Sequence, residues 1–194
     1  RQMFLEHVVP RLISAERIPF LEKQGLVYER FLDMAVIYCI EFTNESTEST
    51  SVIKLTESLR AHFELDLPLL KERALQNIDS RVTIRSMEEV LQILTQGNEP
   101  QLPSSSLYVV SFDDNNYGAA ALLCPDTLTK LSSLLGDQFA ILPSSVHEVI
   151  ATPMADPEEM YETVKHVNLT DVPADQILSD NVYLYDHGTL HAYR

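Results

Sequence analysis

The β-rich segments of this chain follow one another across short turns, and this constrains the fold more than any other sequence feature. Residues 107–112 and 117–123 are largely apolar, and they flank the turn-forming run Asp-Asp-Asn-Asn at 113–116. A connection this short joins antiparallel neighbours, because two parallel strands need a crossover of about a dozen residues or more. The pattern therefore predicts a hairpin over residues 107–123.

Two more strand pairs follow in the second half of the chain. Residues 139–142 and 146–152 are separated by Pro-Ser-Ser, and a strand at 181–185 is followed by a tight turn and a final strand. Helices are predicted between the pairs, one opened by Pro125 and one by Asp156-Pro157-Glu158-Glu159, where Met160, Val164 and Val167 form the inward row. Antiparallel hairpins that alternate with helices indicate the α+β class.

The first half contains a simpler arrangement. Residues 34–42 are almost continuously apolar, which predicts a central strand, and residues 51–55 form the return strand across the polar tract 43–50. A helix is predicted over 66–78, with Asp66 as its cap. The helix opened by Ser86 has the clearest start in the chain, because Ser86 and Glu89 form a capping box before an apolar stripe.

A linker is predicted at residues 98–106, where prolines and serines interrupt both helix and strand patterns. It separates an N-terminal α+β lobe, 1–97, from a C-terminal lobe, 107–194, in which two strands and a helix repeat in the order ββαββαββ.

The charge balance excludes several kinds of partner. Of the 194 residues, 29 are Asp or Glu and 14 are Lys or Arg, so the formal net charge is −15. Binding to nucleic acid or to an anionic membrane needs clustered Lys and Arg, and here the basic residues are scattered. We expect no nucleic-acid or membrane partner. An acidic surface is most often a feature of solubility, and the alternative is attraction to a basic partner; another protein is the partner that the charge allows.

Localisation follows from three further features. No apolar run approaches the roughly 18 residues of a spanning helix, and the first residues lack the form of a secretory signal. The two cysteines, Cys39 and Cys124, lie in apolar runs and are expected to be buried free thiols, which fits a reducing cytoplasm. Because the chain does not begin with Met, we expect a fragment or a processed chain.

The candidate catalytic residues are Ser144, Ser145, His147 and Glu148, which include the side-chain types of a hydrolytic triad. On the predicted strand His147 and Glu148 point to opposite faces, so this glutamate does not orient this histidine. The exposed Gly-x-Ser-x-Gly turn of many serine nucleophiles is also absent. We therefore interpret the block as a turn that leads into a strand, with hydrolysis as the alternative.

The candidate metal ligands are His187 and His191, whose i, i+4 spacing binds zinc on a helix. The segment between them contains Gly188 and Thr189, which disfavour a helix, so we expect no metal site. Residues 113–118 begin like a calcium loop, but position 12 is Cys124 instead of the required glutamate. None of the five glycines forms a phosphate-binding motif, and we expect no cofactor.

Several blocks resemble a known family: residues 9–13, 33–40, 118–120, 142–149, 167–168 and 178–183. They make the chain similar to the bacterial domain-of-unknown-function family 5688, over nearly its whole length, with Pro-Ser-Ser-x-His-Glu-Val as the most specific part. The order of elements shows a fainter similarity to the uncharacterised family 1444. The resemblance implies a bacterial, cytoplasmic protein whose relatives carry a further N-terminal segment, and it implies no activity or site residue.

Three functions are compatible with these observations. The leading hypothesis is a non-enzymatic acidic protein-binding module, an adaptor or chaperone-like protein, because the negative charge favours a basic partner. The second is a hydrolase that uses Ser145, His147 and Glu148. The third is an acidic nucleic-acid mimic, which requires carboxylates along one ridge at phosphate-like spacing.

Overall fold

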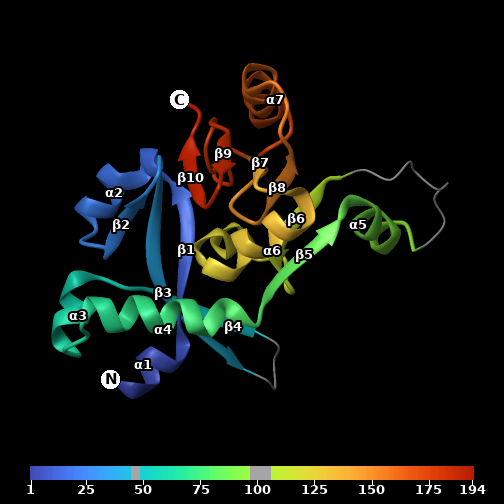
Figure 1. Ribbon diagram of the computed structural model, residues 1–194. Coiled ribbons are helices and arrows are strands. Elements are labelled where there is room, and N and C mark those ends of the chain that lie inside the picture. The colour runs from blue at the N-terminus through green and yellow to red at the C-terminus, as the bar shows by residue number, and fades with distance from the viewer. Residues whose placement is uncertain (45–48, 97–105) are drawn as a thin grey trace. The chain divides into compact units, whose positions relative to one another are not determined.

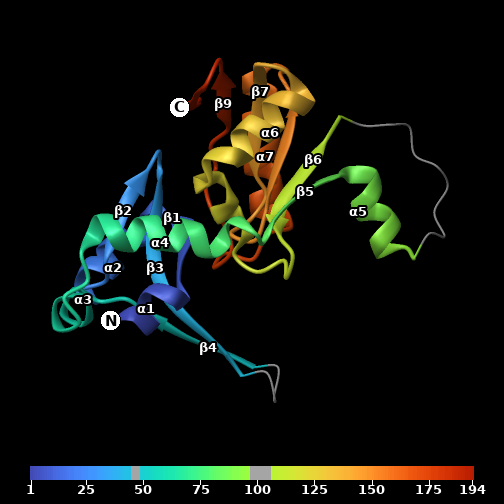
Figure 2. The same cartoon turned by 60° about the horizontal axis from the view of Figure 1, so that its bottom comes forward.

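The computed structural model describes residues 1–44, 49–96 and 106–194, and it divides into two compact units, Arg1–Ser80 and Arg81–Arg194 (Figures 1 and 2). Each unit has its own sheet, and the strands pair antiparallel in both, which confirms the α+β class. The predicted linker 98–106 lies outside the described residues except for Ser106, as do residues 45–48 of the polar tract.

The first unit is built on a four-stranded sheet around β3. β1 pairs with one side of β3, while β2 and β4 follow one another along its other side. Its strands are β1 (Val8–Ser14), β2 (Tyr28–Phe31), β3 (Met34–Asn44) and β4 (Ser49–Lys54). Its helices are α1 (Gln2–His7), η1 (Ala15–Arg17), α2 (Ile18–Lys23), α3 (Glu57–His62) and α4 (Leu67–Asp79).

Helix α4 shows how local sequence positions an element in this unit. The Asp66 side chain accepts a hydrogen bond from the backbone N–H of Leu69, so the predicted cap is confirmed. Leu70, Ala74 and Ile78 repeat every four residues and are fully buried, and α4 packs against β1. The predicted strands 34–42 and 51–55 are likewise present as β3 and β4.

The second unit contains a six-stranded sheet in the order β10-β9-β7-β8-β6-β5. Its strands are β5 (Val82–Ser86), β6 (Tyr108–Phe112), β7 (Gln138–Pro143), β8 (Val149–Pro153), β9 (Tyr183–Asp186) and β10 (Thr189–Ala192). Its helices are α5 (Met87–Leu94), η2 (Gly118–Leu123), α6 (Pro125–Leu135) and α7 (Pro157–Thr170). β5 and α5, which we assigned to the N-terminal lobe, belong to this unit because β5 pairs with β6.

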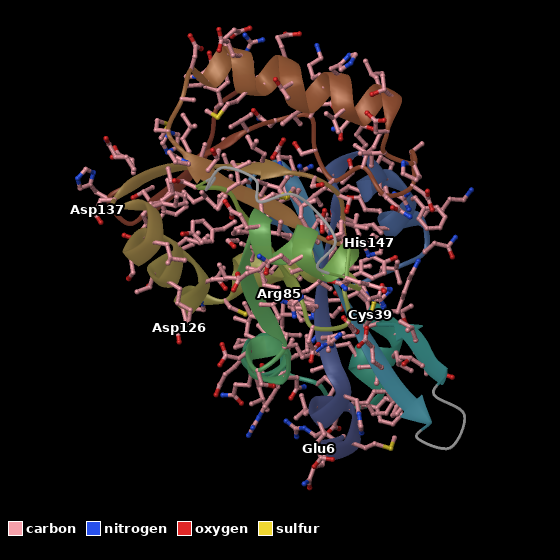
Figure 3. All side chains as sticks on the ribbon, turned by 90° about the vertical axis from the view of Figure 1, so that its right-hand side faces the viewer. Glu6, Cys39, Arg85, Asp126, Asp137 and His147 are labelled. Atoms are coloured by element: carbon pink, nitrogen blue, oxygen red, sulfur yellow. The ribbon has the colours of Figure 1, made fainter. Side chains whose placement is uncertain are left out.

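Helices α6 and α7 lie on opposite sides of strands β7 and β8 (Figures 1 and 3). Met160 and Val164 of α7 pack with Ala140 of β7, as their predicted inward positions require. The prediction that Val167 also faces inward is wrong: Val167 is 37% exposed, and the adjacent residue Asn168 is buried instead. The reason is a buried hydrogen bond, which the Asn168 amide donates to the backbone oxygen of Ser179 at 3.0 Å.

Two strand predictions in this unit are wrong. Residues 117–123 were expected to form the second strand of a hairpin, but residues 118–123 form the 3-10 helix η2, and β6 pairs with β5 and β8. Tyr117 has a φ of 54°, a left-handed conformation that ends the turn and starts η2. β8 begins at Val149, not at Val146, so His147 and Glu148 lie in a loop.

Candidate functional site

The loop 144–148 joins β7 to β8 and contains all the candidate catalytic residues. The backbone N–H of Ser145 donates to the backbone oxygen of Glu148 at 3.1 Å, which closes the turn. The Ser145 hydroxyl accepts from the backbone N–H of His147 at 3.0 Å, and the Ser144 hydroxyl donates to Oε1 of Glu148 at 3.2 Å. Both serine side chains therefore hold the loop in its own conformation.

The imidazole of His147 is held from outside the loop. Its Nδ1 accepts a hydrogen bond from the backbone N–H of Tyr117 at 3.1 Å, and the two rings lie 5.4 Å apart between centroids. Because Nδ1 is the acceptor, the neutral ring carries its proton on Nε2. The histidine thus satisfies a backbone donor at the start of η2.

The backbone of the same loop binds two neighbouring segments. The hydroxyl of Ser111 in β6 donates to the backbone oxygen of His147 at 2.8 Å, and Val146 accepts from the N–H of Ala119 at 3.3 Å. Gly118 lies so close that a Cβ there would stand 2.6 Å from the His147 oxygen and 2.3 Å from the Phe112 nitrogen. Only glycine allows this approach of η2 to the loop.

The structure brings the four candidate catalytic residues into one loop without joining them as a triad. Among the described residues, the hydrogen bond of the imidazole is to Tyr117, while Glu148 accepts from Ser144. The Ser145 hydroxyl contacts the His147 backbone and not its ring. We expected the side chains of His147 and Glu148 to point apart because they were predicted to lie on a strand. They lie in a loop instead, and each binds a different partner.

A cavity of about 230 Å³ lies between α5 and the β5–β6 pair, and Glu148 forms part of its wall. Thr83 and Arg85 of β5 are the direct partners of Ser111 and Val109 of β6, so these four side chains share one face of the sheet. The cavity's polar lining is Thr83, Arg85, Ser111, Asn115 and Glu148, and its apolar lining is Val90, Ile93, Leu94 and Val109.

The two charged side chains of this cavity do not pair. Within the described residues, Arg85 forms no ion pair or side-chain hydrogen bond, and the carboxylate of Glu148 accepts a hydrogen bond from Ser144 alone. Figure 3 labels Arg85 and His147 on the side of the molecule where β5 and α5 face the viewer. An opposite-charged pair that lines one cavity without contact leaves both groups available to a ligand.

The candidate metal ligands lie at the end of the β9–β10 hairpin. His187 is exposed, and its Nδ1 lies 2.6 Å from Oδ1 of Asp186, a contact that raises the pKa of the histidine. His191 is exposed on β10. Over residues 1–44, 49–96 and 106–194, no group of three or more His, Cys, Asp or Glu side chains is arranged to hold a metal ion.

Both cysteines are buried free thiols, as predicted. Cys39 lies in β3, where burial raises the pKa of its thiol to about 11, while Cys124 precedes α6. None of the helices in the described part of the chain is long and apolar enough to cross a membrane.

Sequence reasoning missed the residues that surround the loop. Tyr117 and Ser111 contribute a backbone donor and a hydroxyl from positions about 30 residues earlier in the chain. Thr83 and Arg85 do carry a signal, because polar side chains at alternate positions mark one face of a strand. That signal could not show that this face borders Glu148, since the pairing of β6 with both β5 and β8 brings them together.

Comparison with known proteins adds one match. A model of a protein family, described as a family of unknown function, matches residues 2–187, nearly the whole chain. No curated protein and no solved structure matches the chain. The fainter similarity to family 1444 that we expected has no support.

Proposed function

The chain belongs to the DUF5688 family, whose function is unknown, and we propose that it is a non-enzymatic acidic module that binds a basic region of another protein. The observation that carries this proposal is the uneven charge of the two units. Residues 81–194 contain 16 acidic and 5 basic side chains, whereas residues 1–80 contain 13 and 9. The second unit is therefore the expected binding region.

The few cations of this unit are partly neutralised inside it. Arg81 pairs with Asp114 at 2.9 Å, and Arg194 pairs with Glu158. Glu159 and Glu162 remain exposed on α7, and they form no side-chain ion pair within the described residues. A basic segment of a partner would gain Coulomb energy over α7 and would be attracted to it from a distance, an effect that salt weakens.

The contacts of the 144–148 loop support binding over the hydrolase alternative. A serine nucleophile needs its hydroxyl within hydrogen-bond reach of the base, and the base needs an acid to orient it. Here the Ser145 hydroxyl accepts from a backbone N–H, the ring of His147 accepts from Tyr117, and Glu148 binds Ser144. The hydrogen bonds of these three side chains therefore hold the loop in place, and none of them joins the serine hydroxyl to the imidazole.

A peptide of alternating Lys and Gly tests the proposal, with a Glu-Gly peptide of equal length as its counterpart. We expect the basic peptide to bind with an affinity that falls as salt rises, and to shift the backbone NMR signals of α7. The double variant Glu159→Gln/Glu162→Gln should weaken binding by about two- to thirtyfold, because exposed charge pairs contribute about 0.2–1 kcal/mol each.

The matched control is Glu16→Gln/Glu72→Gln, which removes the same charge from exposed positions of the first unit. Its affinity for the basic peptide should stay within twofold of the unmodified chain, about the effect of net charge alone. Equal binding of both peptides, or an equal loss in the two double variants, would contradict a specific role for the second unit.

A further inference from the structure

We propose that the cavity between α5 and the β5–β6 pair binds a free apolar α-amino acid as its zwitterion, with the carboxylate on Arg85, the ammonium group on Glu148 and the side chain against α5. This site is distinct from the acidic surface of α7, and its occupation does not depend on a protein partner. The inference rests on three properties of the cavity: its cation, its anion and its apolar wall.

The cation is the first property. Arg85 projects from β5 on the same sheet face as Thr83, opposite Val109 and Ser111 of β6. It is one of only five basic side chains among residues 81–194, and it forms no ion pair within the described part of the chain. A guanidinium group binds a carboxylate through two parallel N–H donors, so a partly buried, unpaired arginine in a cavity favours a carboxylate ligand.

The anion is the second property. Glu148 uses Oε1 to accept from Ser144, and no described donor binds its Oε2. The loop that carries Glu148 is held by Ser111, which donates to the His147 backbone and also lines the cavity. The carboxylate is therefore presented from a fixed loop, and an ammonium group supplies donors to such an acceptor.

The apolar wall is the third property. Val90, Ile93 and Leu94 lie at i, i+3 and i+4 on α5, a spacing that places them on one helix face. Ile93 and Leu94 are 62% and 73% exposed, so none of the described residues covers this wall fully. The capping box of Ser86 and Glu89 fixes the start of this helix next to Arg85.

The size and charge of the cavity select the ligand class. A volume of about 230 Å³ lies below the roughly 300–1,000 Å³ of sites for larger ligands, and it suits a molecule of amino-acid size. A ligand with only a carboxylate would leave Glu148 desolvated and unpaired, and an amine would do the same to Arg85. Only a ligand with both charges satisfies both side chains.

Titration of the full chain with L-leucine, 4-methylpentanoate and 3-methylbutylamine tests the proposal, because the last two lack one charge each. We expect L-leucine to bind saturably by calorimetry, and at least about tenfold more tightly than either analogue. In NMR spectra it should shift the backbone signals of Thr83, Val109 and Asn115, whereas those of α7 stay in place.

The variants Arg85→Gln and Glu148→Gln should each weaken L-leucine binding by at least about tenfold, since each removes a charged hydrogen-bond partner. The glutamine at 148 keeps an acceptor for Ser144, so the loop is preserved. Lys130→Gln and Glu72→Gln remove the same charges from exposed positions outside the cavity, and should bind L-leucine as the unmodified chain does.

Absence of saturable L-leucine binding would overturn the proposal, as would equal binding of 4-methylpentanoate. Circular dichroism shows whether each variant is folded, and the NMR mapping on the unmodified chain decides the location without any variant. Peptide binding at α7 is measured separately, so failure of the amino-acid site leaves the proposed protein-binding function untouched, and failure of that function leaves this site untouched.

Discussion

The backbone N–H of Tyr117 donates to Nδ1 of His147 at 3.1 Å, so a left-handed turn residue and a loop imidazole hold two distant segments together. The same loop accepts from Ser111 and from Ala119. The loop that carries His147, the most distinctive motif of the sequence, therefore links β6 and η2 to the β7–β8 hairpin: the His147 side chain binds Tyr117, and the loop backbone binds Ser111 and Ala119.

Replacement of His147 by alanine should lower the free energy of unfolding by about 1–3 kcal/mol, because the N–H of Tyr117 loses its partner. Urea denaturation measures this loss. His166→Ala, an exposed substitution on α7, is the control and should change stability by no more than about 0.5 kcal/mol. Equal stability of the two variants would show that the hydrogen bond between Tyr117 and His147 contributes nothing to stability.

Gly118→Ala should destabilise the chain by about 3 kcal/mol or more, because the new Cβ would lie 2.3 Å from the backbone nitrogen of Phe112. Thermal unfolding followed by circular dichroism is the measurement. Gly136→Ala is the comparison: a Cβ there meets no atom within 4 Å, so the cost comes only from the backbone conformation, φ 88° and ψ −176°, and is about 1–3 kcal/mol. A smaller effect at 118 than at 136 would mean that η2 can move away from the loop.

Cys39 should make the chain less stable at high pH. Burial raises the pKa of its thiol from 9.0 to about 11, so the unfolded chain loses this proton first as the pH rises. The contribution of Cys39 to the free energy of unfolding is therefore fully present below pH 9 and is lost between pH 9 and pH 11. Between pH 8 and pH 10 the free energy of unfolding should fall by about 1 kcal/mol for this reason.

Urea denaturation of the unmodified chain and of Cys39→Ala at both pH values isolates this effect, since other groups titrate equally in the two proteins. The difference in stability between the two should shrink as the pH rises. In the folded chain at pH 8, Cys39 should also resist alkylation that proceeds readily in urea, because the reactive species is the exposed thiolate. Fast alkylation without denaturant would contradict its burial.

His187 should titrate above its ordinary pKa, because the hydrogen bond that its ring donates to the Asp186 carboxylate favours the charged ring. A raised pKa means that the contact stabilises the β9–β10 turn at low pH, and that this stabilisation is lost as the pH rises through the pKa of His187. NMR titration of the imidazole signals checks the shift. Asp186→Asn should bring the pKa of His187 down, and an unaltered pKa of His187 in this variant would contradict the pairing.

The sequence by itself predicted the elements whose signals are local. The caps at Asp66, Ser86 and Asp156 act within three residues of the helix start, so they identified α4, α5 and α7. The apolar run in β3 likewise indicated its strand. A strand buried on both faces is apolar at nearly every position, so it can be identified without knowing which strands pair with it.

Only the tertiary structure decided the elements whose conformation depends on distant partners. Residues 118–123 follow a turn and were expected to form the return strand of a hairpin, yet they form a 3-10 helix in which Gly118 packs closely on Phe112 and His147. Asn168 is buried in place of Val167 because Ser179 and Asp180 provide acceptors for its amide. The serines, His147 and Glu148 were found from the sequence, but their hydrogen-bond partners and the unpaired Arg85 across the cavity were not. Hydrogen bonds and close packing depend on positions in space, and strand pairing brings together residues that sequence spacing keeps apart.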